Sequence, residues 1–290
     1  MNFETRRSGG SPALNYATCD GLGKPALLLL HGVTRCWRDW EPLLPTLTQT
    51  WRVIALDHRG HGTSERAESY RVSDYVADVV RFVRDEVTAP LVILGHSLGA
   101  LVAAGVAAEV PQYVRGIALE DPPFHTMGNR IRSSAWQAQF IGMQAAARRG
   151  GSVDDLTDAL TEIRLPTPGG ALKRLGELRD RASLRWSAEC LTQLDPDVLS
   201  PVIEGRWLDG YDVASILSRV QCPALLLAGD PTAGGALTAS DAEATEAALS
   251  SCQTVHFSGV GHQLHRERPE EVLAALHAFR AKNSEFFNEC

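Results

Sequence analysis

The sequence lacks the features that define several classes of protein. Its cysteines form no C-x-x-C pair and show no spacing typical of metal ligands. They are scattered along the chain: Cys19, Cys36, Cys190, Cys222, Cys252 and Cys290. We interpret them as small buried side chains of a reducing compartment, because a disulfide framework would need a denser and more regular pattern.

Long apolar runs are also missing. The longest clean run, Ala26 to Leu30, is far too short to span a bilayer. The segment Met1 to Ser11 is polar and has no hydrophobic core of the kind that signal peptides contain. We therefore expect a cytoplasmic protein that does not act at a membrane.

Charge of one sign is not concentrated anywhere. The 28 basic and 35 acidic residues give a net charge of −7, and no Lys/Arg run is interleaved with aromatic residues. Nucleic acid is therefore not an expected partner. An apolar fraction of 44% over 290 residues is enough for a large core without disulfide or metal support. The expected partner is a small-molecule substrate, with a homodimer as an open alternative.

What the chain does have is an alternation of strand and helix patterns. Short, nearly continuous apolar runs are typical of strands buried on both faces, as in a parallel sheet. They are Pro25–Leu30, Trp51–Leu56, Pro90–Leu94, Val114–Leu119, Pro223–Ala228 and Cys252–Phe257, with Pro12–Cys19 as an antiparallel edge strand. Helical spacing occurs between them in Ser73–Val87, Leu98–Glu109, Ala239–Ser250 and Pro269–Lys282. The pattern predicts an α/β fold with a doubly wound, mostly parallel sheet.

One stretch interrupts this alternation. Between Pro122 and Val220 we find no strand-like run, whereas helical patterns recur. These patterns are Ile131–Arg149, Val153–Ile163, Ala171–Leu194 and Val213–Leu217, separated by Gly150-Gly151, the turn Pro166–Gly170, Pro196 and Pro201. We interpret residues 122–220 as a helical cap inserted into a core made of residues 1–121 and 221–290. A cap at the carboxyl ends of the strands would cover the place where such sheets bind ligands.

A candidate nucleophile lies where one strand turns into a helix. Gly95-His96-Ser97-Leu98-Gly99 follows the strand Leu91–Leu94 and opens the helix Leu98–Glu109. Small residues on both sides of a serine permit a tight turn that lifts the hydroxyl clear of the sheet, at the positive end of the helix. The alternative is a glycine-rich turn with an idle serine.

Together with three other motifs, this turn resembles the α/β-hydrolase superfamily. Leu28–Gly32 matches the strand ending in His-Gly, with Trp40 nine residues after His31. Asp57–Ser64 matches the loop pattern D-x-R-G-x-G-x-S, and Gly259-Val260-Gly261-His262 follows the last strand. The resemblance implies the α/β-hydrolase fold with an inserted helical cap, in a serine-nucleophile branch similar to esterases and lactonases. It implies no cofactor and no metal.

The resemblance also implies roles for individual residues. Ser97 would be the nucleophile and His262 the base that removes its proton. The N–H groups of Val33 and Leu98 would form the oxyanion hole. The remaining histidines are interpreted as packing, surface or loop residues: His256 lies inside a strand, His265 in a charged turn and His96 beside the nucleophile, while His31, His58 and His61 support loops.

Two residues are candidates for the acid that completes a catalytic triad with Ser97 and His262. Many family members place it three residues after the strand that here ends at Gly229, but that position is Thr232, and Asp230 is the displaced candidate. Other branches, including haloalkane dehalogenases and a zearalenone-lactone hydrolase type, place it after the preceding strand, which here gives Asp121. We favour Asp121, keep Asp230 as the alternative, and place Glu120 third.

The substrate is the least determined feature. Relatives that act on halides or epoxides use aspartate at the elbow, where this chain has Ser97, so hydrolysis of a small hydrophobic ester or lactone is the expected reaction. Hydrolytic C–C cleavage of a β-diketone-type substrate and a ligand receptor with little turnover are the alternatives, and a cofactor-free peroxidase-like side activity is a third. Expected substrate-binding residues are His31 and Gly32 of the loop and apolar side chains of the cap, namely Phe124, Trp136, Phe140, Met143, Trp186 and Trp207. The basic residues Arg148, Arg149, Arg164 and Arg181 are interpreted as solvated helix faces.

Overall fold

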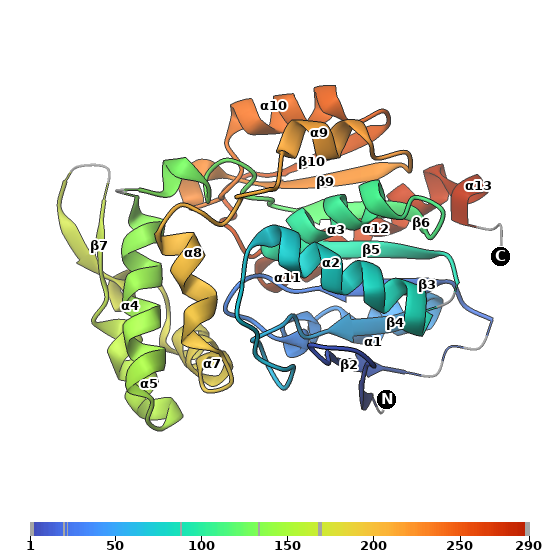
Figure 1. Cartoon of the computed structure of the whole chain (residues 1–290). Coiled ribbons are helices and arrows are strands. Elements are labelled where there is room, and N and C mark those ends of the chain that lie inside the picture. The colour runs from blue at the N-terminus through green and yellow to red at the C-terminus, as the bar shows by residue number, and fades with distance from the viewer. Residues whose placement is uncertain are drawn as a thin grey trace.

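The computed structural model describes residues 3–19, 21, 23–87, 89–132, 134–167 and 170–287, and the fold is built on one large sheet (Figure 1). Cys290 and the Pro168-Gly169 pair of the predicted turn lie outside the described residues. The strands are β1 (Glu4–Arg7), β2 (Asn15–Thr18), β3 (Ala26–Leu30), β4 (Arg52–Leu56), β5 (Leu91–His96), β6 (Val114–Glu120), β7 (Arg164–Pro166), β8 (Leu172–Arg174), β9 (Ala224–Gly229) and β10 (Cys252–Phe257).

The sheet order is β1-β2-β4-β3-β5-β6-β9-β10, so consecutive parallel strands require helical crossovers. The pairs from β4 to β10 are parallel, whereas β2 runs antiparallel to β4 and β1 antiparallel to β2. The doubly wound, mostly parallel sheet predicted from the sequence is confirmed. The edge position predicted for Pro12–Cys19 is wrong, because β1 pairs outside β2. All residues of β1 are exposed and charged or polar, so no apolar pattern marks this strand.

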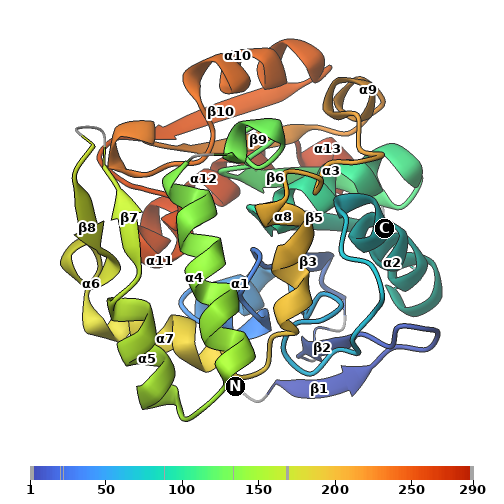
Figure 2. The ribbon, with the colours of Figure 1, turned by 60° about the vertical axis from the view of Figure 1, so that its left-hand side comes forward.

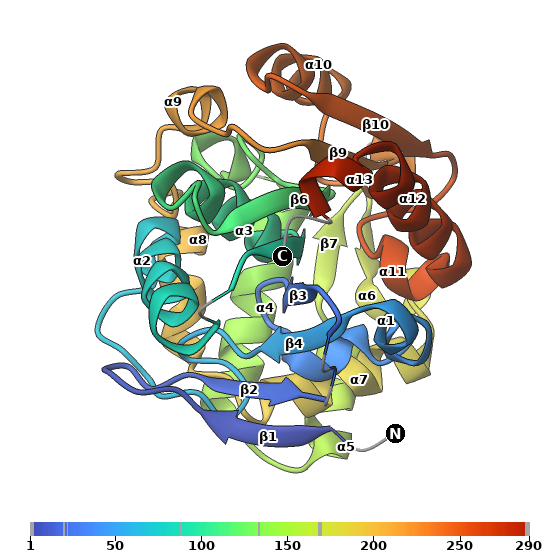
Figure 3. The same ribbon diagram turned by 90° about the vertical axis from the view of Figure 1, so that its right-hand side faces the viewer.

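Helices cover both faces of the sheet, as Figure 3 shows with α2 and α3 on one side and α1 and α12 on the other. The helices of the chain are α1 (Leu44–Thr50), α2 (Val72–Phe82), α3 (Leu98–Glu109), α4 (Ala135–Arg149), α5 (Val153–Thr161), α6 (Leu175–Leu178), α7 (Arg181–Leu191), α8 (Ser200–Ile203), α9 (Val213–Ser218), α10 (Ala239–Ala248), α11 (Leu264–Glu267), α12 (Pro269–Lys282) and α13 (Ser284–Phe287). Shorter 3-10 or π-helical turns are η1 (Trp37–Trp40), η2 (Val83–Val87), η3 (Asn129–Ile131), η4 (Pro196–Leu199) and η5 (Pro231–Ala233). None of the helices within the described ranges combines the length and the apolar content that crossing a membrane requires.

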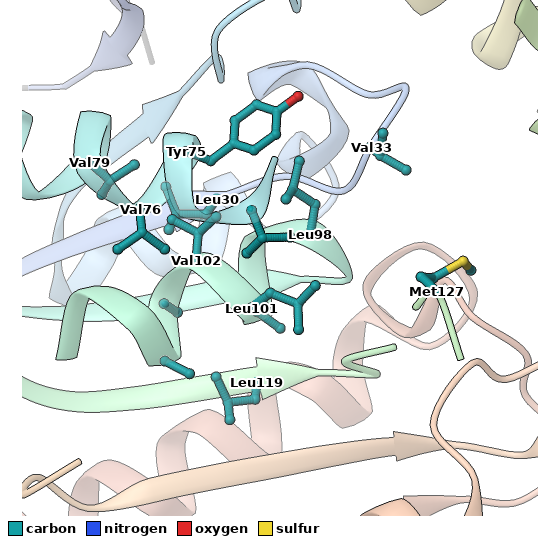
Figure 4. Packing of buried hydrophobic residues seen from close by; sticks show 14 of the residues in the cluster. Leu30, Val33, Tyr75, Val76, Val79, Leu98, Leu101, Val102, Leu119 and Met127 are labelled. Carbon is teal, nitrogen blue, oxygen red and sulfur yellow. The ribbon is translucent and has the colours of Figure 1, made fainter. Parts of the chain in front are cut away.

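The core divides into two layers because side chains alternate along each strand. Leu28 and Leu30 of β3 pack on the face of α2 and α3, whereas Leu27 and Leu29 pack on the face of α1 and α12. Figure 4 shows the first layer, in which Leu30, Val76 and Leu101 meet between the sheet and the helices. Burial of both faces explains why the strands are nearly continuous apolar runs.

The segment between β6 and β9 forms a helical layer that α4, α5, α7 and α8 build beside the sheet (Figures 1 and 2). It also contains the hairpin β7–β8, in which Arg164 lies opposite Arg174. The sequence predicts no strand here, and three-residue strands with exposed positions are too short to produce a pattern. α9, which lies inside the range 122–220, packs against α3 of the sheet domain.

Side-chain hydrogen bonds link this helical layer to the sheet domain at several points. Arg35 Nη1 donates to Ser187 Oγ (2.8 Å) and Trp186 Nε1 donates to Asp39 Oδ1 (2.8 Å). Elsewhere on the contact, the Tyr70 hydroxyl donates to an Asp195 carboxylate oxygen at 2.7 Å. These bonds hold the helices over the ends of β3 and β5.

Candidate active site

Ser97 occupies the sharp turn between β5 and α3. Its φ of 53° and ψ of −112° are rare for a residue with a side chain, and they turn the chain from strand to helix within one residue. A Cβ atom on Gly95 would lie 2.1 Å from the Gly99 carbonyl oxygen, and one on Gly99 would lie 1.9 Å from the Leu30 carbonyl oxygen. The two glycines are therefore required by close backbone approach, which is the physical basis of the motif.

Asp121 and His262 lie against each other at the ends of β6 and β10. His262 Nδ1 donates to Asp121 Oδ2 at 2.5 Å, which leaves Nε2 of the ring as an acceptor. Asp121 is fully buried and has a φ of 42°. Its carboxylate accepts hydrogen bonds from three backbone N–H groups, those of Gly229 (3.2 Å), Ala236 (2.7 Å) and Leu237 (3.2 Å). These backbone hydrogen bonds hold the carboxylate in position independently of its bond to the imidazole.

Asp230, the alternative acid, has a different environment. It begins η5 and accepts hydrogen bonds from Thr232 N (2.8 Å), Thr232 Oγ1 (2.6 Å) and Gly259 N (2.9 Å). The hydroxyl of Thr232, followed by the Gly259 and Thr232 amides, lowers the pKa of Asp230. This is the geometry of an Asp-Pro turn, and the structure places Asp121, not Asp230, on His262.

The loop after β3 lies against the elbow. A Cβ atom on Gly32 would lie 2.7 Å from His96 Nδ1 and 3.3 Å from Ser97 Cβ, so only glycine fits there. Val33 follows, and Leu98 is the first residue of α3. These two residues flank the elbow from the loop and from the helix.

The histidines of the neighbouring loops support the backbone. His31 donates from Nδ1 to the Gly32 carbonyl oxygen (2.8 Å) and accepts at Nε2 from His58 N (3.1 Å). Burial lowers the pKa of His31 and of His58, and it lowers the pKa of His61 to about 3, so these rings are neutral. His31 is fully buried and bonded to the backbone, away from the cavity beside Ser97, so its predicted contact with substrate is not supported.

A small cavity of about 30 Å³ lies beside Ser97 and His262. Its lining residues are Val33, Thr34, Arg35, His96, Ser97, Trp136, Gln139, Phe140, Met143, Arg179, His262 and Gln263. The Trp136 ring lies edge-on to His262 with centroids 5.0 Å apart. The volume holds about one water molecule, so a larger ligand enters only if a lining side chain changes its rotamer. A cavity of about 710 Å³ lies elsewhere, between α2, α3 and α9, and it shares no lining residue with the cavity beside Ser97.

The structure divides the predicted substrate-binding residues of the cap. Trp136, Phe140 and Met143, all on α4, line the cavity. Phe124 and Trp207 are instead enclosed in the apolar core. Trp186 donates to Asp39 and lies under the guanidinium groups of Arg38 and Arg266. Phe124, Trp207 and Trp186 do not line the cavity, because packing or hydrogen bonding elsewhere holds their side chains. Gly32 does not line it either.

A buried charged network lies directly behind the site. His265 Nδ1 is 2.7 Å from Glu120 Oε1 and its Nε2 is 3.2 Å from Asp39 Oδ2. Burial alone would lower the pKa of His265, but the charge of Glu120 and the hydrogen bonds to both carboxylates raise it to about 9. His96 connects the network to the site, since its Nε2 donates to the His262 carbonyl oxygen (2.7 Å).

Sequence reasoning missed this network and two arginines. His265 and Asp39 are far apart in sequence, and nothing in a single sequence shows that they meet. Arg35 and Arg179 both line the cavity, whereas the basic residues interpreted from the sequence are Arg148, Arg149, Arg164 and Arg181. The prediction of solvated helix faces holds for Arg148 on α4 and Arg181 on α7, which are exposed and paired with Asp197 and Asp158, whereas Arg164 is exposed on the strand β7.

In the described part of the chain no group of three or more His, Cys, Asp or Glu side chains is placed to hold a metal ion. The site contains a serine at an elbow and an imidazole bonded to a buried carboxylate, and the serine and the imidazole line one small cavity.

Comparison with known proteins identifies the class to which this site belongs. The sequence matches the alpha/beta hydrolase family over residues 27–275, and the chain belongs to this family. Solved structures share the fold: an enol-lactonase from Burkholderia xenovorans aligns with a TM-score of 0.72 at 20% identity, over 93% of this chain and 96% of that one.

Two relatives show how far the sequence similarity extends. Epoxide hydrolase A of Mycobacterium tuberculosis is 28% identical over 298 aligned positions, covering 89% of this chain and 90% of that protein. The 2-(acetamidomethylene)succinate hydrolase of Mesorhizobium japonicum is 36% identical over 98 residues, which is 33% of this chain and 35% of that protein. The chain spans about a third of the length of the first curated relatives it matches.

Proposed function

We propose that the chain is a serine hydrolase that cleaves a small ester or lactone through an acyl-enzyme on Ser97. The observation that carries the proposal is the 2.5 Å bond between His262 Nδ1 and Asp121 Oδ2, formed in the wall of the cavity into which the Ser97 elbow also opens. A serine hydroxyl is a weak nucleophile until a base removes its proton, and this arrangement provides the base together with the group that orients it.

In the acylation step, Ser97 Oγ attacks the carbonyl carbon of the substrate and its proton passes to His262 Nε2. The imidazolium that forms is stabilised by Asp121, whose second role is to keep the proton on Nδ1 in the resting state. The carbonyl oxygen becomes negatively charged, and the N–H groups of Val33 and Leu98 donate hydrogen bonds to it. His262 then returns its proton to the departing alkoxide, leaving Ser97 acylated.

In the deacylation step, water replaces the alcohol. His262 accepts a proton from the water as its oxygen attacks the acyl carbon, and the same two N–H groups hold the second oxyanion. Collapse of the intermediate returns the proton to Ser97 Oγ and releases the acid. Ser97, His262 and Val33 line the cavity, Leu98 and Asp121 adjoin them, and the steps need no further reagent than water.

Membership of the family does not determine which type of bond is hydrolysed, because the similar proteins include ones named as an epoxide hydrolase and an enol-lactonase. Ser97 favours acyl transfer over epoxide opening, since an elbow serine forms an ester that water can hydrolyse. Trp136, Phe140 and Met143 give the cavity an apolar wall, which suits a small carbon skeleton. We also propose that the segment between β6 and β9 acts as a cap, because α4 supplies this wall.

The test is hydrolysis of 4-nitrophenyl acetate and butyrate. Ser97→Ala and His262→Ala should each reduce kcat by about 10⁴-fold or more, and Asp121→Asn by about 10⁴-fold. Asp230→Asn is the matched carboxylate control and should change kcat less than tenfold, because its bonds are confined to a turn. Mass spectrometry of the intact protein should show an acyl adduct that Ser97→Ala abolishes. Native turnover by Ser97→Ala would overturn the proposal.

A further inference from the structure

Two guanidinium groups reach the cavity beside Ser97 from different parts of the fold. Arg35 belongs to the loop between β3 and η1, and Arg179 follows α6 in the helical layer. Both line the cavity, and none of the other lining residues is an aspartate or glutamate. The lining of the cavity therefore contains two guanidinium groups and no carboxylate, and the acidic residues that interact with them, Asp39 with Arg35 and Glu267 with Arg179, lie outside the lining.

Arg35 is held by neutral partners only. Its Nη1 donates to Ser187 Oγ at 2.8 Å. With the Gln263 amide turned so that its oxygen faces the guanidinium, Nε and Nη2 donate to that oxygen at 3.2 and 2.5 Å. Only 5% of the residue is exposed, and it makes no ion pair within 4 Å among the described residues. These bonds fix the orientation of Arg35 without neutralising it.

Arg179 has still fewer partners. Across the described ranges its side chain makes no hydrogen bond and no ion pair within 4 Å. Burial, followed by the nearby charge of Arg35, lowers the pKa of Arg179 to about 10, with Glu267 acting in the opposite direction. A partly buried cation next to a like charge is unfavourable unless an anion joins them.

Two other shielded arginines of this chain are paired with carboxylates. Arg59 is paired with both oxygens of Asp78, at 2.5 and 2.7 Å, and Arg266 is paired with Asp39 at 3.2 Å. Arg35 and Arg179 have no such carboxylate partner among the described residues, and both line the cavity beside Ser97. A ligand carboxylate would provide the missing partner and could accept planar, paired hydrogen bonds from either guanidinium.

We propose that Arg35 and Arg179 form a carboxylate-binding subsite, and that the substrate is an ester or lactone that carries a free carboxylate beside the scissile bond. This inference rests on the proposed function, whose substrate class it specifies. The carboxylate lies between the loop after β3 and the residue after α6, so that substrate binding ties the helical layer to the sheet domain. The apolar wall of α4 receives the carbon skeleton between the carboxylate and the carbonyl.

A binding experiment tests the subsite without relying on turnover. Ser97→Ala protein is titrated with glutarate and with butyrate, which share one carboxylate, whereas glutarate alone has a second. Glutarate should bind about 10- to 100-fold more tightly than butyrate, as expected for one charge-assisted contact. Adding Arg179→Met should abolish this preference, and Arg179→Lys should retain part of it. Inorganic phosphate binding more tightly than glutarate would overturn the assignment to a carboxylate.

Arg179 is the position to change, because Arg35 also bonds to Ser187 and Gln263 and its loss could disturb the fold. Arg181→Met is the matched control: Arg181 is exposed, is paired with Asp158 at 2.9 Å, and does not line the cavity. It should preserve the preference for glutarate. A preference for glutarate that Arg179→Met leaves intact, or affinities for both carboxylates that Arg179→Met leaves unchanged, would refute the subsite.

A kinetic experiment separates the subsite from the proposed function. In otherwise native protein, the ratio of kcat/KM for the 4-nitrophenyl monoester of adipate to that for 4-nitrophenyl hexanoate should fall about 10- to 100-fold in Arg179→Met. Ser97-dependent turnover of both esters with an unchanged ratio would refute the subsite and leave the hydrolase intact. Turnover of neither ester, with an Arg179-dependent preference for glutarate, would refute ester hydrolysis and leave the subsite intact.

Discussion

His265 is enclosed by two carboxylates, and its charge should make the stability of the protein depend on pH in a specific window. The residue is fully buried, and both ring nitrogens face carboxylate oxygens, those of Glu120 and Asp39. A neutral imidazole can donate only one hydrogen bond, so satisfying both contacts requires the protonated ring. Arg266, which also contacts Asp39, completes a group of two positive and two negative charges.

The size of the effect follows from the rise in the pKa of His265 from 6.5 to about 9. A group with a raised pKa in the folded state stabilises that state fully below the unfolded pKa, and the stabilisation is lost as pH rises through the folded pKa. At about 1.4 kcal/mol for each tenfold change, the full contribution is about 3 kcal/mol at pH 6. About 2 kcal/mol of it should be lost between pH 7.5 and pH 9.5.

The assay is urea unfolding of the native protein and of His265→Gln at several pH values between 7.5 and 9.5. The difference in unfolding free energy between the two proteins should shrink by about 2 kcal/mol from pH 7.5 to pH 9.5. Taking the difference removes the ionisation of buried cysteines, which both proteins share. His256→Gln is the matched control, because His256 is exposed on β10 and should show no such change. A difference for His265→Gln that stays constant over the window would refute the protonated state.

Three further predictions follow from close contacts. Gly99→Ala places a methyl group 1.9 Å from a carbonyl oxygen of β3 and should cost about 3 kcal/mol in urea unfolding, whereas Gly9→Ala, whose added methyl would lie 3.9 Å from its nearest neighbour, should change stability by less than about 0.5 kcal/mol. Trp136→Ala removes the ring packed on His262 and should raise kcat/KM for 4-nitrophenyl octanoate relative to acetate about tenfold; an unchanged ratio would mean that chain length is limited elsewhere. Tyr70→Phe removes a 2.7 Å bond to the helical layer and should cost about 1–3 kcal/mol, measured by the same unfolding assay, and a smaller loss would show that water replaces the hydroxyl.

The sequence contained enough information for the sheet and for the backbone of the site. Strands buried on both faces are apolar throughout, and the flanking glycines of the elbow are needed because the chain approaches itself within van der Waals distance. Such requirements restrict which residue types can stand at given positions, so a single sequence expresses them. β1 and the β7–β8 hairpin impose no comparable local requirement, because exposed short strands tolerate many residues.

The rest of the site depends on contacts between distant segments. Whether Asp121 or Asp230 meets His262 is decided by the loop after β10, and only coordinates show that Asp230 is occupied by its own turn. The same holds for Arg35 and Arg179, which are 144 positions apart in the sequence and line the same cavity. For large apolar residues such as Trp207, the prediction of substrate contact is wrong, because an aromatic side chain in this segment can pack in the core as readily as it can bind a ligand.

The backbone angles of Ser97 and Asp121 lower the stability of the fold at residues that the proposed activity requires. Both residues have positive φ, at 53° and 42°, although neither is glycine, and each such conformation costs roughly 1–3 kcal/mol. Glycine at position 97 would relieve that cost and leave a more stable protein without the proposed nucleophile. In a population of variants, selection for folding alone would therefore remove the site, and only selection for turnover would keep a serine at the bend.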